Sequence, residues 1–321
     1  MKKYSIKTTM QKIYETKKTG IHRNNQWSKR TRTRRDFLTV GSTTVLCFAT
    51  STLGCAEKIM NGNYNFSFGV ITDLHYAEKE MEINRYYRES DEKLRECIET
   101  FNSLQPDFII ELGDFVDSGD RDTELGYLQT INNIFKEFDG ERYYVIGNHD
   151  LSTFSKEEFI RFSGSSDTHF SFDHEDCHFV VLDANFKRDG SDYNAGNFDW
   201  METFIPESQQ KWLKNDLEQA KEKQTIVFVH QNLNDENSPY GVKNAPEVRK
   251  ILESAGNVLA VFQGHDHSGG YAVINGIHYV TFRAAVEGSS LKNNAFAVVY
   301  MSGKGNIRVK GYKKQRSIDL F

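Results

Sequence analysis

The chain has 321 residues, of which 38% are hydrophobic, 26% charged and 13% aromatic, and its formal net charge is −5. These values exclude a disordered chain and a collagen-like repeat, and 4 cysteines are too few for a disulfide scaffold. No apolar stretch reaches the roughly 18 residues that a membrane-spanning helix needs, which excludes a polytopic membrane protein.

Charge is distributed unevenly along the chain. Residues 1–55 hold 12 lysines and arginines against 2 acidic residues, a net charge of +10, so the remaining residues carry −15. An acidic body of this kind has no basic stripe, and we therefore expect no nucleic-acid partner.

The basic N-terminal segment has the features of an export signal. Paired arginines, Arg34 and Arg35, precede Phe37-Leu38 and a short apolar run that ends near Thr50. This pattern resembles the twin-arginine signal and predicts an exported bacterial protein of the periplasm or cell envelope, with the twin-arginine export machinery as a partner. The alternative is a basic tail that binds an anionic partner. We assign residues 1–60 to the signal region and linker, removed or disordered, and residues 61–321 to one folded domain.

The end of this segment carries a second targeting feature. Cys55 follows Leu53-Gly54, but a lipoprotein signal usually places Leu three positions before its cysteine, and here the spacing is two. Lipidation of Cys55, the only expected membrane attachment, therefore stays open against ordinary cleavage nearby. Cys97 and Cys177 are widely spaced, and we expect buried thiols rather than a bridge.

From residue 65 onward, short apolar runs alternate with amphipathic helical patterns. This alternation predicts βαβ units in a layered α/β domain. The predicted strands are Phe66–Thr72, Phe108–Leu112, Tyr143–Ile146, Phe179–Leu182, Thr225–Val229, Val258–Phe262 and Ile277–Phe282. The predicted helices are Ile83–Leu104, Glu124–Phe138, Glu207–Lys221 and Ala245–Ala255.

The C-terminal part has a different pattern. Strands at Tyr271–Ile274, Ile277–Phe282, Ala295–Tyr300 and Asn306–Tyr312 are joined by short turns such as Asn275-Gly276, which predicts antiparallel pairing. Residues 185–205 are too long for an ordinary connection and are interpreted as a candidate substrate lid.

Polar clusters follow five of the predicted strands. Open α/β sheets place their sites at these strand ends. The clusters are Asp73-Leu74-His75, Gly113-Asp114-Phe115-Val116-Asp117, Gly147-Asn148-His149-Asp150, His230, and Gly264-His265-Asp266-His267.

Each cluster alone is ordinary turn chemistry, but the five together predict a pair of divalent metal ions. Carboxylate and amide oxygens suit Mn or Mg, while imidazoles suit Zn and Fe. As a purely structural device the set would be costly, because buried Asp and His without partners cost several kcal/mol each. We expect two divalent ions, with Mn favoured and Fe, Zn or Mg as alternatives.

The order D-x-H, G-D-x-x-D, G-N-H-D, a single strand-end H, and G-H-x-H resembles that of the calcineurin-like metallophosphoesterases, over residues 66–283. The resemblance implies an α/β fold, a four-layer α/β/β/α sandwich of two mixed sheets. It also implies a dinuclear metal site at the C-terminal ends of the strands, within a metallophosphoesterase domain at 61–321.

The resemblance further implies a role for each residue. The first metal would be held by Asp73, His75 and His267. The second would be held by Asn148, His230 and His265, with Asp114 bridging both. His149 would contact the phosphate as the catalytic general acid, while a metal-bridged hydroxide attacks phosphorus. Asp117 and Asp150 would orient the ligands. Asp117 also stands where purple acid phosphatases have tyrosine, so no purple Fe(III) centre is expected.

Longer segments resemble one branch of the family, the manganese-dependent ADP-ribose/CDP-alcohol diphosphatases. They are Phe68–Asp73, Arg85–Arg88, Gln209–Leu217, Gly264–Tyr271 and Gly276–Thr281. This resemblance predicts a hydrolase of phosphodiester or diphosphate bonds in small nucleotide-type substrates. The alternatives are an exported phosphomonoesterase, alkaline-phosphatase-like, that scavenges phosphate, and a non-catalytic metal-dependent binding module.

Overall fold

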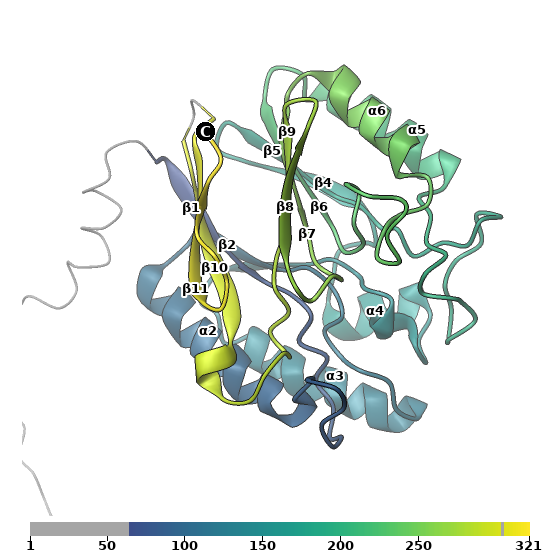
Figure 1. Cartoon of the computed structure of the whole chain (residues 1–321), viewed down its shortest axis with the longest axis vertical. Helices are drawn as coiled ribbons and strands as arrows, with labels where there is room; N and C mark the ends of the chain where they lie inside the picture. Colours follow the sequence, from purple (N-terminus) through teal and green to yellow (C-terminus); the bar gives the residue numbers. More distant parts are fainter. Residues whose placement is uncertain (1–63, 303–304) are drawn as a thin grey trace, which may run out of the picture. The chain divides into compact units, whose positions relative to one another are not determined.

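The computed structural model describes residues 64–302 and 305–321 (Figure 1). The predicted twin-arginine motif, Cys55 and the boundary at residue 60 lie outside the described residues, so these features and the division into 1–60 and 61–321 stay predictions. No helix in the described ranges has the length and apolar character that crossing a membrane requires.

The first of two sheets is built around the N-terminal strand. Its order is β12-β11-β10-β1-β2-β3. The strands are β1 (Phe66–Ile71), β2 (Phe108–Glu111), β3 (Glu141–Tyr144), β10 (Ala295–Met301), β11 (Ile307–Lys313) and β12 (Ile318–Asp319). Strands β1, β2 and β3 are parallel, whereas β10, β11 and β12 add antiparallel strands on the other side of β1.

The second sheet has the order β4-β5-β6-β7-β9-β8. Its strands are β4 (Phe170–His174), β5 (Cys177–Val181), β6 (Gln224–Val229), β7 (Val258–Gln263), β8 (Gly270–Ile274) and β9 (Ile277–Thr281). Strands β5, β6, β7 and β9 are parallel, and β4 and β8 pair antiparallel at the two edges. Both sheets are therefore mixed, as predicted, and the C-terminal antiparallel strands are divided between them.

Helices cover the outer face of each sheet (Figure 1). Helices α2 (Ser90–Leu104) and α3 (Arg121–Phe135) pack on the first sheet, where Leu94 and Ile131 share a core with Ile109. Helices α5 (Glu207–Gln219) and α6 (Ala245–Ala255) pack on the second, where Leu213 and Val227 share another core. The remaining helices are α4 (Lys156–Ser163) and the 3-10 turns η1 (Tyr87–Glu89), η2 (His149–Leu151) and η3 (Leu291–Asn293).

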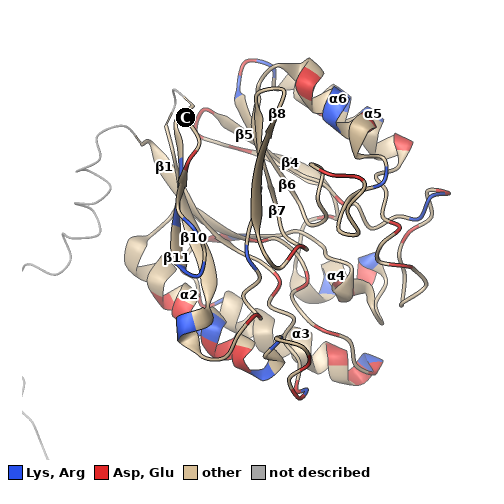
Figure 2. Ribbon diagram, in the orientation of Figure 1, with Lys and Arg blue, Asp and Glu red and all other residues tan. Residues whose placement is uncertain are grey.

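The inner faces of the sheets form an aromatic core. Phe68 of β1 stacks on Phe108 of β2 with ring centroids 4.9 Å apart, and it meets Phe179 and Phe228 of the second sheet edge-on at 5.7 Å each. Since both faces of the central strands are buried, these strands are mostly apolar, and β5, β6 and β7 contain no Lys, Arg, Asp or Glu (Figure 2). The four-layer α/β/β/α sandwich is confirmed.

Several predicted boundaries are wrong. The helix expected from Ile83 begins at Ser90, because Ile83 has a left-handed φ of 58° and is 98% exposed. The third strand ends at Tyr144, two residues before the expected end. Helix α4 and strands β4 and β12 were not expected from the sequence. The prediction for Cys97 and Cys177 is confirmed, since both are buried free thiols.

Candidate metal centre

The five polar clusters converge at one end of the sandwich. Strands β1, β2 and β3 deliver Asp73, Asp114 and Asn148 from the first sheet, while β6 and β7 deliver His230 and His265 from the second. Side-chain donor atoms within 4.8 Å of one another form three groups, two of which share His75. These groups are Asp73-His75-His267, Asp114-His230-His265 and His75-Asp117-His149.

The backbone at this end is held in an unusual conformation. Asp73, His75, Asp114 and His265 all have left-handed φ angles, of 52°, 44°, 57° and 64°. Such angles are uncommon outside glycine and cost free energy that the surrounding structure must offset. Gly113, with φ 102°, completes the turn, and any Cβ there would collide with the His230 ring. The strained backbone at these positions thus orients the four side chains toward the cluster.

The first group has the spacing of ligands around one ion. Asp73 Oδ1 lies 3.7 Å from His75 Nε2 and 3.5 Å from His267 Nε2, and the two Nε2 atoms are 3.1 Å apart. Donors about 2.1 Å from one ion at right or tetrahedral angles are separated by about 3.0–3.4 Å, so the two nitrogens have this spacing and the carboxylate oxygen lies slightly farther from them. The Asp73 carboxylate is fixed by its other oxygen, Oδ2, which accepts hydrogen bonds from the Thr72 hydroxyl at 2.6 Å and the His265 N–H at 3.1 Å.

The second group shares an oxygen with the first. Asp114 Oδ2 lies 3.2 Å from His230 Nε2 and 3.5 Å from His75 Nε2, while His265 Nδ1 lies 3.1 Å from His230 Nε2. The other Asp114 oxygen, Oδ1, accepts a hydrogen bond from the His149 N–H at 2.8 Å. Asp114 therefore points one oxygen between the two groups, which is the arrangement that a bridging ligand needs.

Proton positions on the imidazoles favour a cation in each group. His267 Nδ1 faces the Glu287 carboxylate at 2.7 Å, and His230 Nδ1 faces the Leu112 carbonyl at 2.8 Å. Because carboxylate and carbonyl oxygens only accept, each Nδ1 carries a proton, and each Nε2 is the nitrogen that can present a lone pair to a metal ion once it has no proton of its own. Asp73 Oδ1 and the amide oxygen of Asn148 are buried with no hydrogen-bond partner. Lone pairs and unpartnered oxygens that converge in this way fit divalent metal ions.

The pKa values of the histidines divide into two sets. Burial opposes a charged imidazole, but at His75 and His230 nearby carboxylates, Asp114 foremost, outweigh it and raise the pKa to about 9. At His149 and His265 burial dominates and lowers the pKa to about 4 and about 3. His149 is thus a neutral ring at neutral pH in the free protein.

His149 lies at the accessible side of the cluster, next to the buried carboxylate of Asp117. The His149 side chain is 28% exposed, and its Nδ1 lies 3.5 Å from Asp117 Oδ2, which is also 3.2 Å from His75 Nδ1. Lys79 Nζ lies 2.5 Å from Asp117 Oδ1, and an Arg85 guanidinium nitrogen lies 4.0 Å from Oδ2. Asp117 therefore holds two imidazoles and two cationic side chains around one carboxylate.

Asp150 fixes the loop that carries Asp114. Its buried carboxylate accepts hydrogen bonds from the backbone N–H groups of Asp114, Phe115, Val116 and Gly147, at 2.9–3.3 Å. The orienting roles expected for Asp117 and Asp150 stay predictions. The role assigned to each individual ligand, and to His149 as the acid, stays a prediction.

Three further residues contact the site residues, and no sequence motif assigned them to the site. Glu287 contacts His267 from the connection after β9, and Lys79 and Arg85 reach Asp117 from the connection after β1. Arg85 belongs to a segment used above only for its resemblance to a family branch. Glu287 and Lys79 lie outside any recognisable motif, so no sequence signal could have found them.

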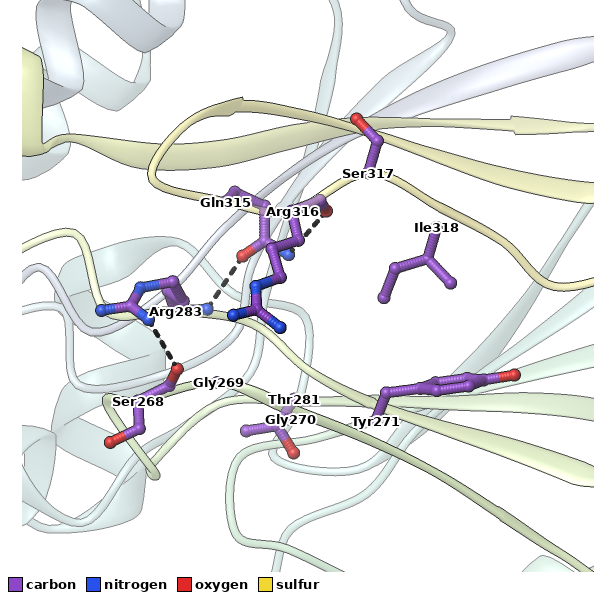
Figure 3. Close-up of a pocket in the computed structure, with 10 residues that line it drawn as sticks. All are labelled: Ser268, Gly269, Gly270, Tyr271, Thr281, Arg283, Gln315, Arg316, Ser317 and Ile318. Atoms are coloured by element: carbon purple, nitrogen blue, oxygen red, sulfur yellow. Dashed lines mark hydrogen bonds between the residues drawn. The ribbon is translucent and has the colours of Figure 1, made fainter.

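A cavity of about 300 Å³ begins one residue beyond His267 (Figure 3). Arg283 borders it, donating from its guanidinium to the Ser268 carbonyl at 3.0 Å and from its backbone N–H to Gln315 Oε1 at 2.9 Å. None of the predicted metal ligands lines this cavity, which is built by the β8–β9 hairpin and the connection into β12. It lies beside the metal centre and is a separate feature of the fold.

Comparison with known proteins agrees with the geometry. The family model described as calcineurin-like phosphoesterase matches residues 66–269. Proteins named manganese-dependent ADP-ribose/CDP-alcohol diphosphatase are 28% identical in Oryza sativa, covering 69% of this chain and 84% of the relative, and 29% identical in Arabidopsis thaliana, covering 69% and 86%. The crystal structure of a dimetal phosphatase from Danio rerio superposes with a TM-score of 0.70 at 21% identity, covering 80% of this chain and 99% of that one.

The family match spans most of the described residues and includes all five polar clusters. The fold, the two groups of donor atoms and the shared Asp114 oxygen are what a divalent metal centre requires. The chain therefore belongs to the calcineurin-like phosphoesterase family and is a hydrolase of phosphoric ester or diphosphate bonds that uses divalent metal ions.

Proposed function

We propose that the chain hydrolyses the diphosphate or phosphodiester bond of small nucleotide conjugates, with Mn²⁺ as its preferred metal. One observation carries the proposal: the two donor groups that share Asp114 Oδ2 occur in a chain whose relatives are named manganese-dependent ADP-ribose/CDP-alcohol diphosphatases. The phosphomonoesterase alternative has no structural observation of its own. A binding module without activity would be expected to lack ligands, whereas here all seven predicted ligand positions hold Asp, Asn or His.

The residues of the chain have distinct tasks in this reaction. Divalent ions held by the two groups would polarise the phosphoryl oxygens and lower the pKa of water. Asp114 and Asp73 present one oxygen each to the cluster and keep the other in a fixed hydrogen bond, so their geometry is set before substrate binds. His149 lies at the accessible side, where a bound phosphate would raise the pKa of its ring, which could then protonate the leaving oxygen. Lys79 and Arg85 add positive charge beside it.

A substrate panel tests the proposal. The purified chain, stripped of metal and reloaded with Mn²⁺, is given ADP-ribose, CDP-choline, a cyclic nucleotide and p-nitrophenyl phosphate, beside a His149→Ala variant. We expect nucleoside monophosphate from the first two, strongly reduced in the variant. Free phosphate from p-nitrophenyl phosphate alone would make the chain a phosphomonoesterase.

We also propose that the chain is exported through the twin-arginine pathway. The support is the Arg34-Arg35 pair with the apolar run that follows it. Replacing both arginines by lysine should retain the chain in the cytoplasmic fraction, whereas the unchanged chain appears in the cell envelope. A Cys55→Ala variant that still pellets with membranes would exclude a lipid anchor at that residue.

A further inference from the structure

Two aromatic side chains from separate connections meet at the metal centre. Trp200, in the long segment before α5, and Tyr240, in the connection after β6, each lie with their ring centroids 5.6 Å from the His265 ring, at 73° and 84°. Their own centroids are 6.0 Å apart, with an angle of 33° between the ring planes. Trp200 is 38% exposed, which is high for a large aromatic side chain placed against a buried histidine. Part of the indole beside the cluster is therefore accessible to a ligand.

The backbone on either side of Trp200 is fixed. The Asp199 carbonyl accepts a hydrogen bond from the Tyr193 hydroxyl at 2.9 Å, and the Asp199 carboxylate accepts one from the Met201 N–H at 3.0 Å. The Tyr193 ring is buried and stacks on Phe198 at 4.1 Å and 5°. The segment expected to be a lid is thus anchored by the stacked pair Tyr193 and Phe198. Trp200 is not part of this pair and lies against His265 instead.

The Tyr240 backbone is fixed in a comparable way. Its carbonyl accepts a hydrogen bond from the Asn232 N–H at 3.0 Å, and its N–H donates to Ser238 Oγ at 3.2 Å. A Cβ on Gly241 would collide with the Asp235 carbonyl, so the turn that presents Tyr240 requires glycine there. The backbone that carries each ring is therefore preorganised, which reduces the entropy lost when a ligand binds.

We propose that Trp200 and Tyr240 form the stacking surface for the nucleobase of the substrate. This inference rests on the proposed function and specifies how its substrate class is recognised. Stacking on aromatic side chains tolerates any base, because every base has a π-face. The surface should accept purine and pyrimidine conjugates alike, with the reacting phosphate placed by the metal centre.

The positions of the aromatic and cationic side chains also suggest how the substrate is oriented over the two donor groups. Trp200 and Tyr240 contact His265, which belongs to the second donor group. Lys79 and Arg85 instead approach Asp117, which contacts His75 of the first group. The nucleoside would lie over the second group, and the other end of the conjugate would extend toward the two cationic side chains.

Trp200 fluorescence provides a direct test of stacking. In a Trp27→Phe/Trp212→Phe background Trp200 is the one remaining tryptophan. We expect AMP and CMP to quench its emission and ribose 5-phosphate to leave it unchanged. Equal quenching by all three, or none, would overturn the proposal whatever the catalytic activity is.

Kinetics with a matched substrate pair supply the second test. ADP-ribose is compared with the base-free diphosphate in which a hydroxyl replaces adenine, using the Mn²⁺-loaded full chain. Trp200→Ala and Tyr240→Ala should each raise KM for ADP-ribose by about tenfold and leave kcat/KM for the base-free compound unchanged. Trp200→Phe and Tyr240→Phe should restore most of the affinity. Tyr271→Ala, which removes an exposed tyrosine in the cavity of Figure 3, should have no effect.

The two proposals fail in different ways. Equal losses on both compounds, or no loss on either, would overturn the stacking surface and leave the diphosphatase intact. Hydrolysis of neither compound alongside turnover of p-nitrophenyl phosphate would overturn the proposed function, and the fluorescence titration would then decide whether the aromatic pair binds bases.

Discussion

Glu287 accepts a hydrogen bond from His267 Nδ1 at 2.7 Å, and this bond determines which nitrogen of His267 faces the metal cluster. The carboxylate lies on the connection after β9, 20 residues beyond the histidine. It also accepts a hydrogen bond from the Asn84 side chain at 2.6 Å, and the bond to His267 lowers the Glu287 pKa. A carboxylate behind a ligating histidine raises the basicity of that ligand and fixes its orientation.

We therefore expect Glu287→Ala to weaken metal binding by about 10–100-fold. The measurement is a Mn²⁺ titration of the stripped chain by isothermal calorimetry. Glu287→Gln should lose less, because the amide oxygen can still accept from Nδ1. Glu247→Gln, an exposed position on α6, is the control. If Glu287→Ala binds Mn²⁺ with unchanged affinity, His267 does not need the Glu287 carboxylate in order to bind the metal.

Asp150→Ala should destabilise the chain even when no metal is present. The substitution leaves four buried backbone N–H groups without an acceptor, and it removes charge-assisted hydrogen bonds. The expected loss in the free energy of unfolding is about 3 kcal/mol or more. Urea unfolding in EDTA measures it. A midpoint equal to that of the unchanged chain would mean that the loop after β2 holds its shape without Asp150.

Glycine-to-alanine substitutions should have opposite effects at two positions. At Gly147 a Cβ would collide with the backbone nitrogen and carboxylate of Asp114, so Gly147→Ala should displace the bridging residue and reduce kcat/KM by more than about 100-fold. At Gly126, within α3, a Cβ meets nothing within 4 Å. Gly126→Ala should therefore stabilise the chain by about 1 kcal/mol and leave activity unchanged. Activity retained in Gly147→Ala would contradict the close approach.

A histidine far from the metal centre should make stability depend on pH. His178 Nδ1 lies 2.8 Å from Asp173 Oδ1, and its Nε2 lies 2.8 Å from Asp216 Oδ2. Burial opposes a charge there, but the hydrogen bonds to Asp216 and Asp173 outweigh it and raise the pKa. A raised pKa in the folded state means stability that is fully present below the unfolded pKa, about 6.5, and is lost as the pH rises through the folded value.

The comparison variant is His178→Gln, which keeps hydrogen bonding but cannot become charged. We expect it to lower the free energy of unfolding at pH 5.5 by on the order of 1 kcal/mol, and by less at pH 9. Chemical denaturation at the two pH values gives the difference. If the variant loses as much free energy of unfolding at pH 9 as at pH 5.5, or more, the His178 ring is not charged in the folded chain.

The sequence allowed the fold and the convergence of the site to be predicted, because each polar cluster directly follows an apolar run that reads as a buried strand. Asp114 and His230 could in this way be placed at the carboxyl ends of strands, although nothing in the sequence shows that the two strands belong to different sheets. Glu287 could not, since its approach to His267 depends on the path of the chain after β9, which no local pattern specifies.

The start of α2 shows how tertiary contacts can override a helical pattern. Apolar spacing extends back to Ile83, but Tyr86 donates its N–H to the Val286 carbonyl at 3.0 Å and Arg85 lies near Asp117. These contacts hold the segment at the site and outside the helix. Helix α4, by contrast, begins with a capping box of Ser155 and Glu158, a signal that the sequence does contain.

The metal-binding residues come from both sheets. Asp73, Asp114 and Asn148 follow strands of the first, whereas His230 and His265 follow strands of the second. A folding intermediate in which each sheet has formed but the two have not docked would hold two incomplete half-sites. Metal uptake during refolding would therefore report the moment of docking, and tight binding would penalise any fluctuation that separates the sheets.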